Sequence, residues 1–598
     1  MVDAIQEVTG AEDILWDLSD LYKGMDDPAI ERDFTESQSK AEAFAARYRG
    51  KVATLSAQEL AKALVETEQL SEQFGRVGNY AGLQWNTDTA NQAFGALLQR
   101  TREAGSQFYQ TMLFFDLEWA NIPIEHIKIV DDPALARWRH YLLKMLDMRP
   151  YLLSEPEEKI LAEKSVTGIS AWTRYFGEVF GAARYDVEGQ KVPQDVVLKR
   201  SYSGDRNVRR AAAESLTLGL QETLQTSTYI FNTMLADKTS DDRLRKFPNW
   251  ISARNLDNEA SDATVDALVS AVTSRYDIVA RYYKLKKQLL GYDELYDYDR
   301  YAPLEESESR YSWNQAREIV VKAYAAFHPQ MAEIATKFFD NNWIHAPALP
   351  GKRGGAFASP TIPSAHPYVF LNYTGTDRDV MTLAHELGHG IHMYLSRPKG
   401  ALEAGTPLTT AEMASVFGEQ LVFNDLMNRE TDPAVRLSML ARKIEDSFAT
   451  VFRQLSMNRF EDAIHTARRS EGELTHQRIS ELWLKSQRDM FQNSVTMRDE
   501  YGIWWSYIPH FINTPGYVYA YSFGNLLVLA LFSKYQAEGG SFASKYLEVL
   551  SSGGSDKPEA ILAKAGVDLT DPGFWHQGLK TLDDMVGQLE GLVKAQKP

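Results

Sequence analysis

One stretch of this chain carries three histidines at helical spacing, and it constrains the fold more than any other feature. It spans residues 377–395 and reads DRDVMTLAHELGHGIHMYL. Thr376 or Asp377 can cap the start of a helix and Pro398 can end it, so the pattern predicts one helix. His385 and His389 are four residues apart, which places both imidazoles on one face, a single turn from each other. Both imidazoles can therefore reach one metal ion.

Glu386, which directly follows the first of these two histidines, adds a possible catalytic group. His385, Glu386 and His389 form the pattern H-E-x-x-H, which is typical of zinc peptidases with the glutamate as general base. Gly388 and Gly390 lie in the middle of the predicted helix, where each costs ~1 kcal/mol relative to alanine. We therefore expect another element or the substrate to approach closely here. The alternative is a pair of surface histidines on an ordinary helix.

A catalytic zinc usually has a third protein ligand and keeps its fourth position for water. His392 lies roughly 10 Å along the helix axis from the first histidine, too far to share the ion, so we interpret it as a packing residue or a neighbour of the ligands. Glu403, Glu412 and Glu419 follow downstream as candidates. The sequence Thr409 to Glu412 is also a capping box. Spacing alone does not choose among the three.

Composition excludes several classes of protein. The chain has no cysteine, which rules out disulfide frameworks, cysteine nucleophiles and thiolate metal sites. Its 64 basic and 81 acidic residues give a net charge of −17, which disfavours nucleic acids and anionic membranes as partners. The apolar run at residues 517–532 is too short and too polar to span a bilayer. The start of the chain lacks the features of a signal peptide, so we expect a cytoplasmic protein.

Helical periodicity dominates the rest of the chain, and strand signals are few. Residues 185–192 predict a small hairpin around Glu188-Gly189, and residues 367–373 predict a short strand. Residues 341–367 are rich in proline and glycine and predict a long loop. We therefore expect a mostly α protein with one small sheet. A polar stretch near residue 205 suggests an N-terminal helical domain, 1–205, and a catalytic domain, 206–598.

Several motifs together resemble one known family. TLAHELGHGIH, followed by TTAEMASVFGEQL and later by PHFINTPGYVYAYSFG, is similar to the thimet oligopeptidase family of zinc metallopeptidases, above all to its oligoendopeptidase F branch. WDLSDLYKG near the start and LLSEPEEKILAEKSVTGISAWTRYF further on are also similar, so the resemblance covers nearly the whole chain. It implies a gluzincin-like fold: a two-lobed helical bowl around a deep substrate channel, with a small sheet beside the zinc helix.

The resemblance also implies roles for the residues of the first motif. His385 and His389 match the two zinc-binding histidines of the family, and Glu386 matches its general base. Glu412, within AEMAS, matches the third ligand of a single Zn²⁺ ion. Asp379 stands where this branch often has an acidic residue, which either orients a ligand or caps the helix.

The C-terminal motif implies further active-site groups. The family places a histidine and then tyrosines over the scissile carbonyl, and His510, Tyr517 and Tyr521 are the matching residues here. The spacing from the histidine to the first tyrosine is longer than in familiar members, and a Pro-Gly pair intervenes. Tyr519 is expected in the core.

The implied activity is zinc-dependent endoproteolysis of short unfolded peptides by a metal-activated water. Glu386 takes the proton of that water, and Tyr517 with His510 stabilises the oxyanion, a role worth ~10²–10³ in rate for one donor. The strand at 367–373 would be an edge strand that binds the peptide, and residues 352–355 would meet its terminal carboxylate. The alternatives are a zinc carboxypeptidase on the same scaffold and a catalytically silent, metal-dependent peptide-binding protein. Short peptides are the expected partners, without nucleic acid or membrane, and no oligomeric state is predicted.

Overall fold

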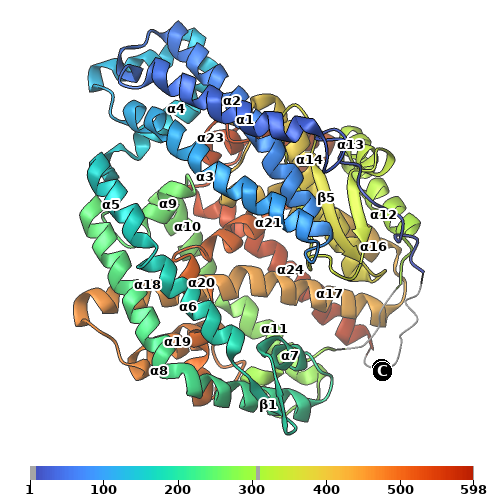
Figure 1. Cartoon of the computed structure of the whole chain (residues 1–598). Helices are drawn as coiled ribbons and strands as arrows, with labels where there is room; N and C mark the ends of the chain where they lie inside the picture. Colours follow the sequence, from blue (N-terminus) through green and yellow to red (C-terminus); the bar gives the residue numbers. More distant parts are fainter. Residues whose placement is uncertain (1–7, 305–309, 597–598) are drawn as a thin grey trace. The chain divides into compact units, whose positions relative to one another are not determined.

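The computed structural model describes residues 8–304 and 310–596, and it is mostly helical with two small sheets (Figure 1). The prediction of a mostly α fold is therefore confirmed. The chain divides into two compact units of three segments each. The first contains Met1–Arg149, Glu308–Arg429 and Lys534–Asp568, and the second contains Pro150–Ser307, Glu430–Ser533 and Leu569–Pro598. Among the described residues, no helix is both long enough and apolar enough to cross a bilayer.

The first unit surrounds one three-stranded sheet with helices. Its main elements are α1 (Pro28–Tyr48), α2 (Ala57–Thr87), α3 (Gln92–Ala120), α4 (Arg139–Asp147), α12 (Trp313–Phe327), α13 (Pro329–Asp340), β3 (Ile344–Pro347), β4 (Phe357–Ser359), β5 (Tyr368–Tyr373), α14 (Asp377–Ser396), α15 (Leu408–Ala411), α16 (Met413–Arg429), α22 (Gly540–Ser551) and α23 (Pro558–Ala563).

The sheet of the first unit has the order β3-β5-β4, with β5 parallel to β3 and antiparallel to β4. Val369 of β5 pairs with Ile344 on one side and with Ala358 on the other. The expectation that residues 367–373 form an edge strand is therefore wrong, because both sides of β5 are already hydrogen-bonded. The run Tyr368–Leu371 is buried throughout, a pattern typical of a central strand. Both neighbouring strands lie within the stretch that we expected to be a loop.

The second unit is built almost entirely of helices. Its elements are α5 (Glu155–Ser165), α6 (Ile169–Ala182), β1 (Tyr185–Val187), β2 (Gln190–Val192), α7 (Gln194–Arg200), α8 (Arg206–Arg245), α9 (Ser252–Asp257), α10 (Asp262–Thr273), α11 (Tyr276–Leu289), α17 (Pro433–Phe448), α18 (Gln454–Glu471), α19 (His476–Phe491), α20 (His510–Asn513), α21 (Tyr519–Glu538) and α24 (Pro572–Gln596), with the division from the first unit falling inside α21.

One local prediction in the second unit, the small hairpin, is confirmed. β1 and β2 form the expected antiparallel hairpin, and Glu188 and Gly189 both have positive φ, as a two-residue type I′ turn requires. The apolar run at 517–532 forms most of α21 and is largely buried, so it is a core helix. α17 continues through a π-helical turn, Ala449–Arg453, into α18. α17 itself packs beside α24 (Figure 1).

Residue 205, where the sequence predicts a domain boundary, caps the start of α8 inside the second unit. The compact units describe packing in space, whereas the predicted domains, 1–205 and 206–598, are continuous folding units along the chain. The predicted division stays a prediction.

Candidate active site

The histidine-rich helix is α14, and its start is set by side chains close to it in sequence. Thr376 Oγ1 accepts the N–H of Asp379 at 3.2 Å, while Asp379 Oδ2 accepts the N–H groups of Thr374 and Thr376 at 3.0 Å. This reciprocal capping box satisfies backbone donors that have no partner inside the helix. Of the two roles open for Asp379, the structure therefore gives it that of a capping residue.

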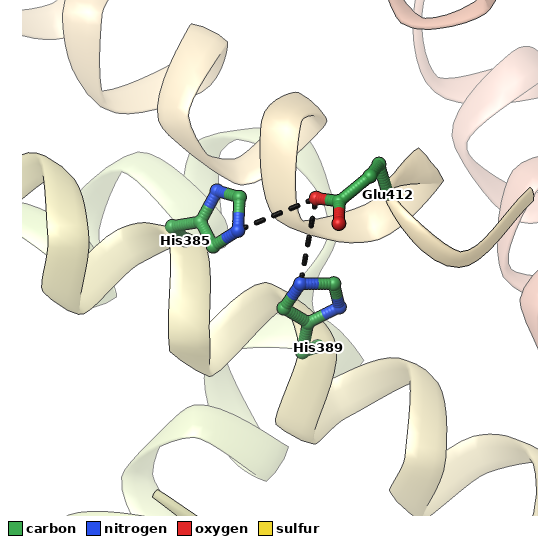
Figure 2. Close-up of side chains that lie close together, drawn as sticks. All are labelled: His385, His389 and Glu412. Carbon is green, nitrogen blue, oxygen red and sulfur yellow. Dashed lines mark ion pairs between the residues drawn. The ribbon is translucent and has the colours of Figure 1, made fainter. Parts of the chain in front are cut away.

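Three predicted metal ligands converge in the first unit. Figure 2 shows the imidazoles of His385 and His389 turned towards the carboxylate of Glu412. Glu412 Oε2 lies 3.3 Å from Nε2 of His385 and 3.5 Å from Nε2 of His389. The three ligand atoms all lie within 4.8 Å of one another, and no other such group occurs in the described part of the chain. A single ion can therefore contact all three side chains.

Close packing of two helices delivers Glu412 to this position. It lies between α15 and α16, and α16 passes directly over α14 at Gly388. A Cβ at Gly388 would lie only 2.4 Å from the carbonyl oxygen of Ala414, so no other residue fits there without displacing α16. At Gly390, a Cβ would lie 2.6 Å from the ring of Phe338. The mid-helix glycines therefore permit the close approach that the sequence led us to expect.

Two further side chains on α16 hold the ligand candidates in place. Glu419 Oε1 lies 2.5 Å from Nδ1 of His385, the ring nitrogen that does not face Glu412. Ser415 donates from Oγ to Glu412 Oε2 at 2.9 Å. Such outer contacts fix ring orientation and leave Nε2 of His385 free to act as a ligand. We expected Glu419 only as a ligand candidate; its position two turns after Glu412 could have indicated this supporting role.

Charges in the cluster shift the pKa values of its members in opposite directions. Burial alone would raise the pKa of Glu412, but the hydrogen bond from His389 and the charges of both histidines lower it to about 2. Burial alone would lower the pKa of His385, but Glu419, Glu412 and Glu386 raise it to about 9. The protons shared in this cluster are those that a divalent cation would displace, because metal ligands must be deprotonated.

Glu386 differs from the ligand candidates. Its side chain is only 6% exposed, and Oε2 has no hydrogen-bond partner among the described residues. Burial raises its pKa, and the charges of His385 and His389 offset part of that effect. A buried carboxyl oxygen without a partner is costly, so its position beside the ligand cluster calls for a group that the protein itself does not supply.

The remaining candidates of this unit lie elsewhere. His392 is buried. Mainly this burial, and to a lesser extent the charge of His389, lowers the pKa of His392 to about 3, so it is a neutral packing residue. Glu403 accepts the N–H of Tyr141 at 3.0 Å and does not belong to the ligand group. Lys352 donates to the carbonyl of Pro347 at 2.6 Å and so faces its own sheet, which does not fit the expected contact with a peptide carboxylate.

The second unit brings together the other three predicted site residues. The rings of His510 and Tyr517 are parallel within 4° with centroids 6.1 Å apart, and the rings of Tyr517 and Tyr521 meet edge to face at 4.9 Å. Tyr521 Oη lies 3.4 Å from Nε2 of His510. Tyr519 is fully buried, and its hydroxyl accepts from Asn258 Nδ2 at 2.9 Å, as expected for a core residue.

The donor set of the first cluster fits a divalent transition metal. Two imidazole nitrogens and one carboxylate oxygen match the protein ligands of catalytic zinc sites, and zinc binds such ligands in tetrahedral geometry with one position left open. The unpartnered oxygen of Glu386 beside them fits a base that acts on a molecule at that open position.

Comparisons with known proteins find relatives over nearly the whole chain. A family model described as Peptidase family M3 matches residues 200–581, and one described as Oligopeptidase F matches residues 118–185. Oligopeptidase PepF of Bacillus subtilis (strain 168) is 28% identical, with 98% of this chain and 88% of that protein covered. An oligoendopeptidase F homolog of Lactococcus lactis subsp. lactis (strain IL1403) is 24% identical, with 98% of each chain covered.

Solved structures resemble the chain over nearly its whole length. A peptidase from Chlamydophila abortus superposes with a TM-score of 0.87 at 23% identity, covering 97% of this chain and 98% of that one. Oligoendopeptidase-F from Enterococcus faecium superposes with a TM-score of 0.71 at 23% identity, covering 95% and 99%. At such identities these structures establish a common fold.

Proposed function

The chain belongs to peptidase family M3, and from this membership we propose that it is a zinc-dependent endopeptidase that hydrolyses short, unfolded peptides. The observation that carries the proposal is the convergence of His385, His389 and Glu412, whose ligand atoms lie within 4.8 Å of one another, beside the unpartnered Oε2 of Glu386. The names of the similar bacterial proteins, oligopeptidase and oligoendopeptidase, support peptides as the substrate class.

His385, His389 and Glu412 would hold the zinc ion, while Glu419 keeps the ring of His385 oriented. When bound, the ion supplies a Lewis acid that lowers the pKa of water towards ~7 and polarises the peptide carbonyl. Glu386 takes the proton of the attacking water on its Oε2, holds it, and passes it to the nitrogen of the leaving amine. Its raised pKa suits it to carry that proton between the two partners.

The same proposal assigns oxyanion stabilisation to the tyrosine cluster of the second unit. A phenol hydroxyl donates a hydrogen bond and stays protonated at neutral pH, so Tyr517 and Tyr521 can stabilise negative charge on the carbonyl oxygen. His510, 3.4 Å from the hydroxyl of Tyr521, orients that hydroxyl. Burial and the charge of Arg453 lower the pKa of His510, which favours the neutral ring.

The two alternative functions are a zinc carboxypeptidase and a catalytically silent peptide-binding protein, and each predicts a different result. A carboxypeptidase needs a free C-terminal carboxylate, whereas an endopeptidase cleaves a peptide blocked at both ends. A silent binding protein would have no use for the buried carboxyl of Glu386. Cleavage of a mixed peptide library, read by mass spectrometry with and without a chelator, tests all three. We expect internal cleavage that the chelator abolishes; removal of C-terminal residues alone, or no cleavage, would contradict the proposal.

A cytoplasmic location belongs to the same proposal, with short peptides as partners and neither nucleic acid nor membrane. Fractionation of cells that produce the protein, with activity assayed in each fraction, tests the location.

A further inference from the structure

The segment that joins α20 to α21 contains an unusual turn. Pro515 and Gly516 lie between His510 and Tyr517, and Gly516 has φ +75°, a conformation that side chains with a Cβ rarely adopt. A Cβ at Gly516 would also lie 2.6 Å from Cδ1 of Ile251, so the turn fits tightly against its surroundings. This turn determines where Tyr517 is placed, because Tyr517 is the next residue in the chain.

Two side chains from separate helices hold the turn by its backbone. Glu461 Oε1, from α18, accepts the N–H of Gly516 at 2.8 Å. Arg254 Nε, from α9, donates to the carbonyl of Pro515 at 3.4 Å. Trp250 packs 3.4 Å from the position of a Cβ on Gly516, and its Nε1 donates to Asp462 of α18 at 2.8 Å. The turn is therefore held from both α18 and the α9 region.

A buried glutamate such as Glu461 is an unexpected residue to hold a backbone turn. Its side chain is 1% exposed, and Oε2 has no hydrogen-bond partner among the described residues. Within that part of the chain, no lysine or arginine forms an ion pair with it. Burial raises its pKa to about 8, so the side chain is a neutral acid at neutral pH. An aliphatic residue would be easier to bury, so its one hydrogen bond to Gly516 is what the fold gains from it.

The position of Tyr517 also determines its ring contacts with two neighbouring side chains. Its ring is parallel to that of His510 and in edge-to-face contact with that of Tyr521. A turn that shifts would therefore move the Tyr517 hydroxyl and loosen the contacts among the three rings. Misplacement of a reacting group by about 1 Å can cost ~10²-fold in rate.

We propose that Glu461 is a positioning residue, which fixes the Pro515–Gly516 turn and thereby the Tyr517 hydroxyl for catalysis. The proposal rests on the proposed function, since it takes Tyr517 as a donor to the oxyanion. Glu461 itself touches no substrate, and it acts only through the backbone of Gly516.

The test compares three substitutions of one side chain. Glu461→Gln keeps an acceptor oxygen at the same distance, Glu461→Asp withdraws the acid by one methylene, and Glu461→Leu removes the acceptor. Each is made in the wild-type protein and in Tyr517→Phe, and kcat and KM are measured on one internally quenched peptide. Glu471→Gln, at an exposed position on the same helix, is the control.

We expect Glu461→Gln and Glu471→Gln to keep kcat within about threefold, and Glu461→Asp and Glu461→Leu to lower it ~10²-fold with little change in KM. In the Tyr517→Phe background the same substitutions should cost less than about threefold, because residues that act together are not additive. Should Glu461→Leu fail to fold, Glu461→Asp, which keeps the acid, carries the test.

Wild-type kcat in Glu461→Asp or Glu461→Leu, or an equal loss in both backgrounds, would overturn the positioning role. A wild-type protein that cleaves no peptide, or a Tyr517→Phe variant with full kcat, would instead contradict the proposed function and this proposal with it. The two failures are therefore distinguishable in one set of measurements.

Discussion

The carboxylate oxygen Oε1 of Glu419 lies 2.5 Å from Nδ1 of His385, the ring nitrogen that does not face Glu412. This contact fixes which nitrogen of the ring carries the proton and leaves Nε2, 3.3 Å from Glu412, to act as a ligand. Glu419 is thus placed to affect metal binding without contacting the ion.

Glu419→Leu should weaken zinc binding, because His385 loses the carboxylate that orients its ring and raises its basicity. Losses of about 10–100-fold in metal affinity are typical for such partners. Competition with a chromophoric chelator measures the dissociation constant. Glu419→Gln, which keeps an acceptor oxygen but loses the charge, should show a smaller loss. Equal affinity in all three proteins would show that Glu419 does not support the ligand.

Glu386→Gln should nearly abolish hydrolysis while zinc stays bound, since the amide cannot accept the proton but none of the three ligands is changed. General bases contribute about 10²–10⁴-fold, and kcat should fall by that amount. Glu403→Gln, at another buried glutamate outside the ligand group, is the matched control and should keep full activity. Metal content per chain and kcat are measured on the same samples, and unchanged activity in Glu386→Gln would refute its role as base.

Gly388→Ala should destabilise the first unit and weaken metal binding, because the added Cβ would lie 2.4 Å from the carbonyl of Ala414. Overpacking of this kind typically costs ~1–3 kcal/mol. Gly82→Ala in α2 meets nothing within 4 Å and should be neutral or stabilising by up to ~1 kcal/mol. Urea unfolding monitored by circular dichroism compares the two. Equal stability of both variants would mean that α14 and α16 do not approach as closely as described.

Glu403 should make the stability of the protein fall as pH rises. It is 3% exposed, and burial raises its pKa from 4.5 to about 7. The folded state therefore holds a proton that the unfolded chain releases above its own pKa, so the stabilisation is complete below pH 4.5 and is lost as pH rises through about 7. Urea unfolding at several pH values should show a flatter pH dependence for Glu403→Gln than for the wild type. Identical slopes would place the pKa of Glu403 near its ordinary value.

Local patterns predicted the fold well wherever neighbours in sequence determine the structure. A capping box formed by Ser56 and Glu59, three residues apart, begins α2, with the N–H of Ser56 donating to Glu59 Oε2 at 2.8 Å. The hairpin at Glu188-Gly189 follows from the backbone of those two residues alone. Strand order does not depend on neighbours in sequence, which is why the central position of β5 and its pairing with β3 and β4 were missed.

The site shows the same division between local and distant information. The four-residue spacing of His385 and His389 is a property of one helix, so the sequence was enough to place both on one face. The choice of Glu412 over Glu403 and Glu419 depends on how α16 crosses α14 at Gly388, a tertiary contact that spacing does not encode. Spacing and the capping box at Thr409 left Glu412 open between two roles, and the family resemblance supplied the choice.

We propose that one zinc ion, held by His385, His389 and Glu412, is required for peptide hydrolysis. The most direct measurement titrates zinc into chelator-treated protein while following cleavage of an internally quenched peptide that is blocked at both ends. We expect no cleavage without metal and a linear return of activity that saturates at one zinc per chain, with no return in His389→Ala. Full activity in the zinc-free protein, or equal reactivation of His389→Ala, would contradict it.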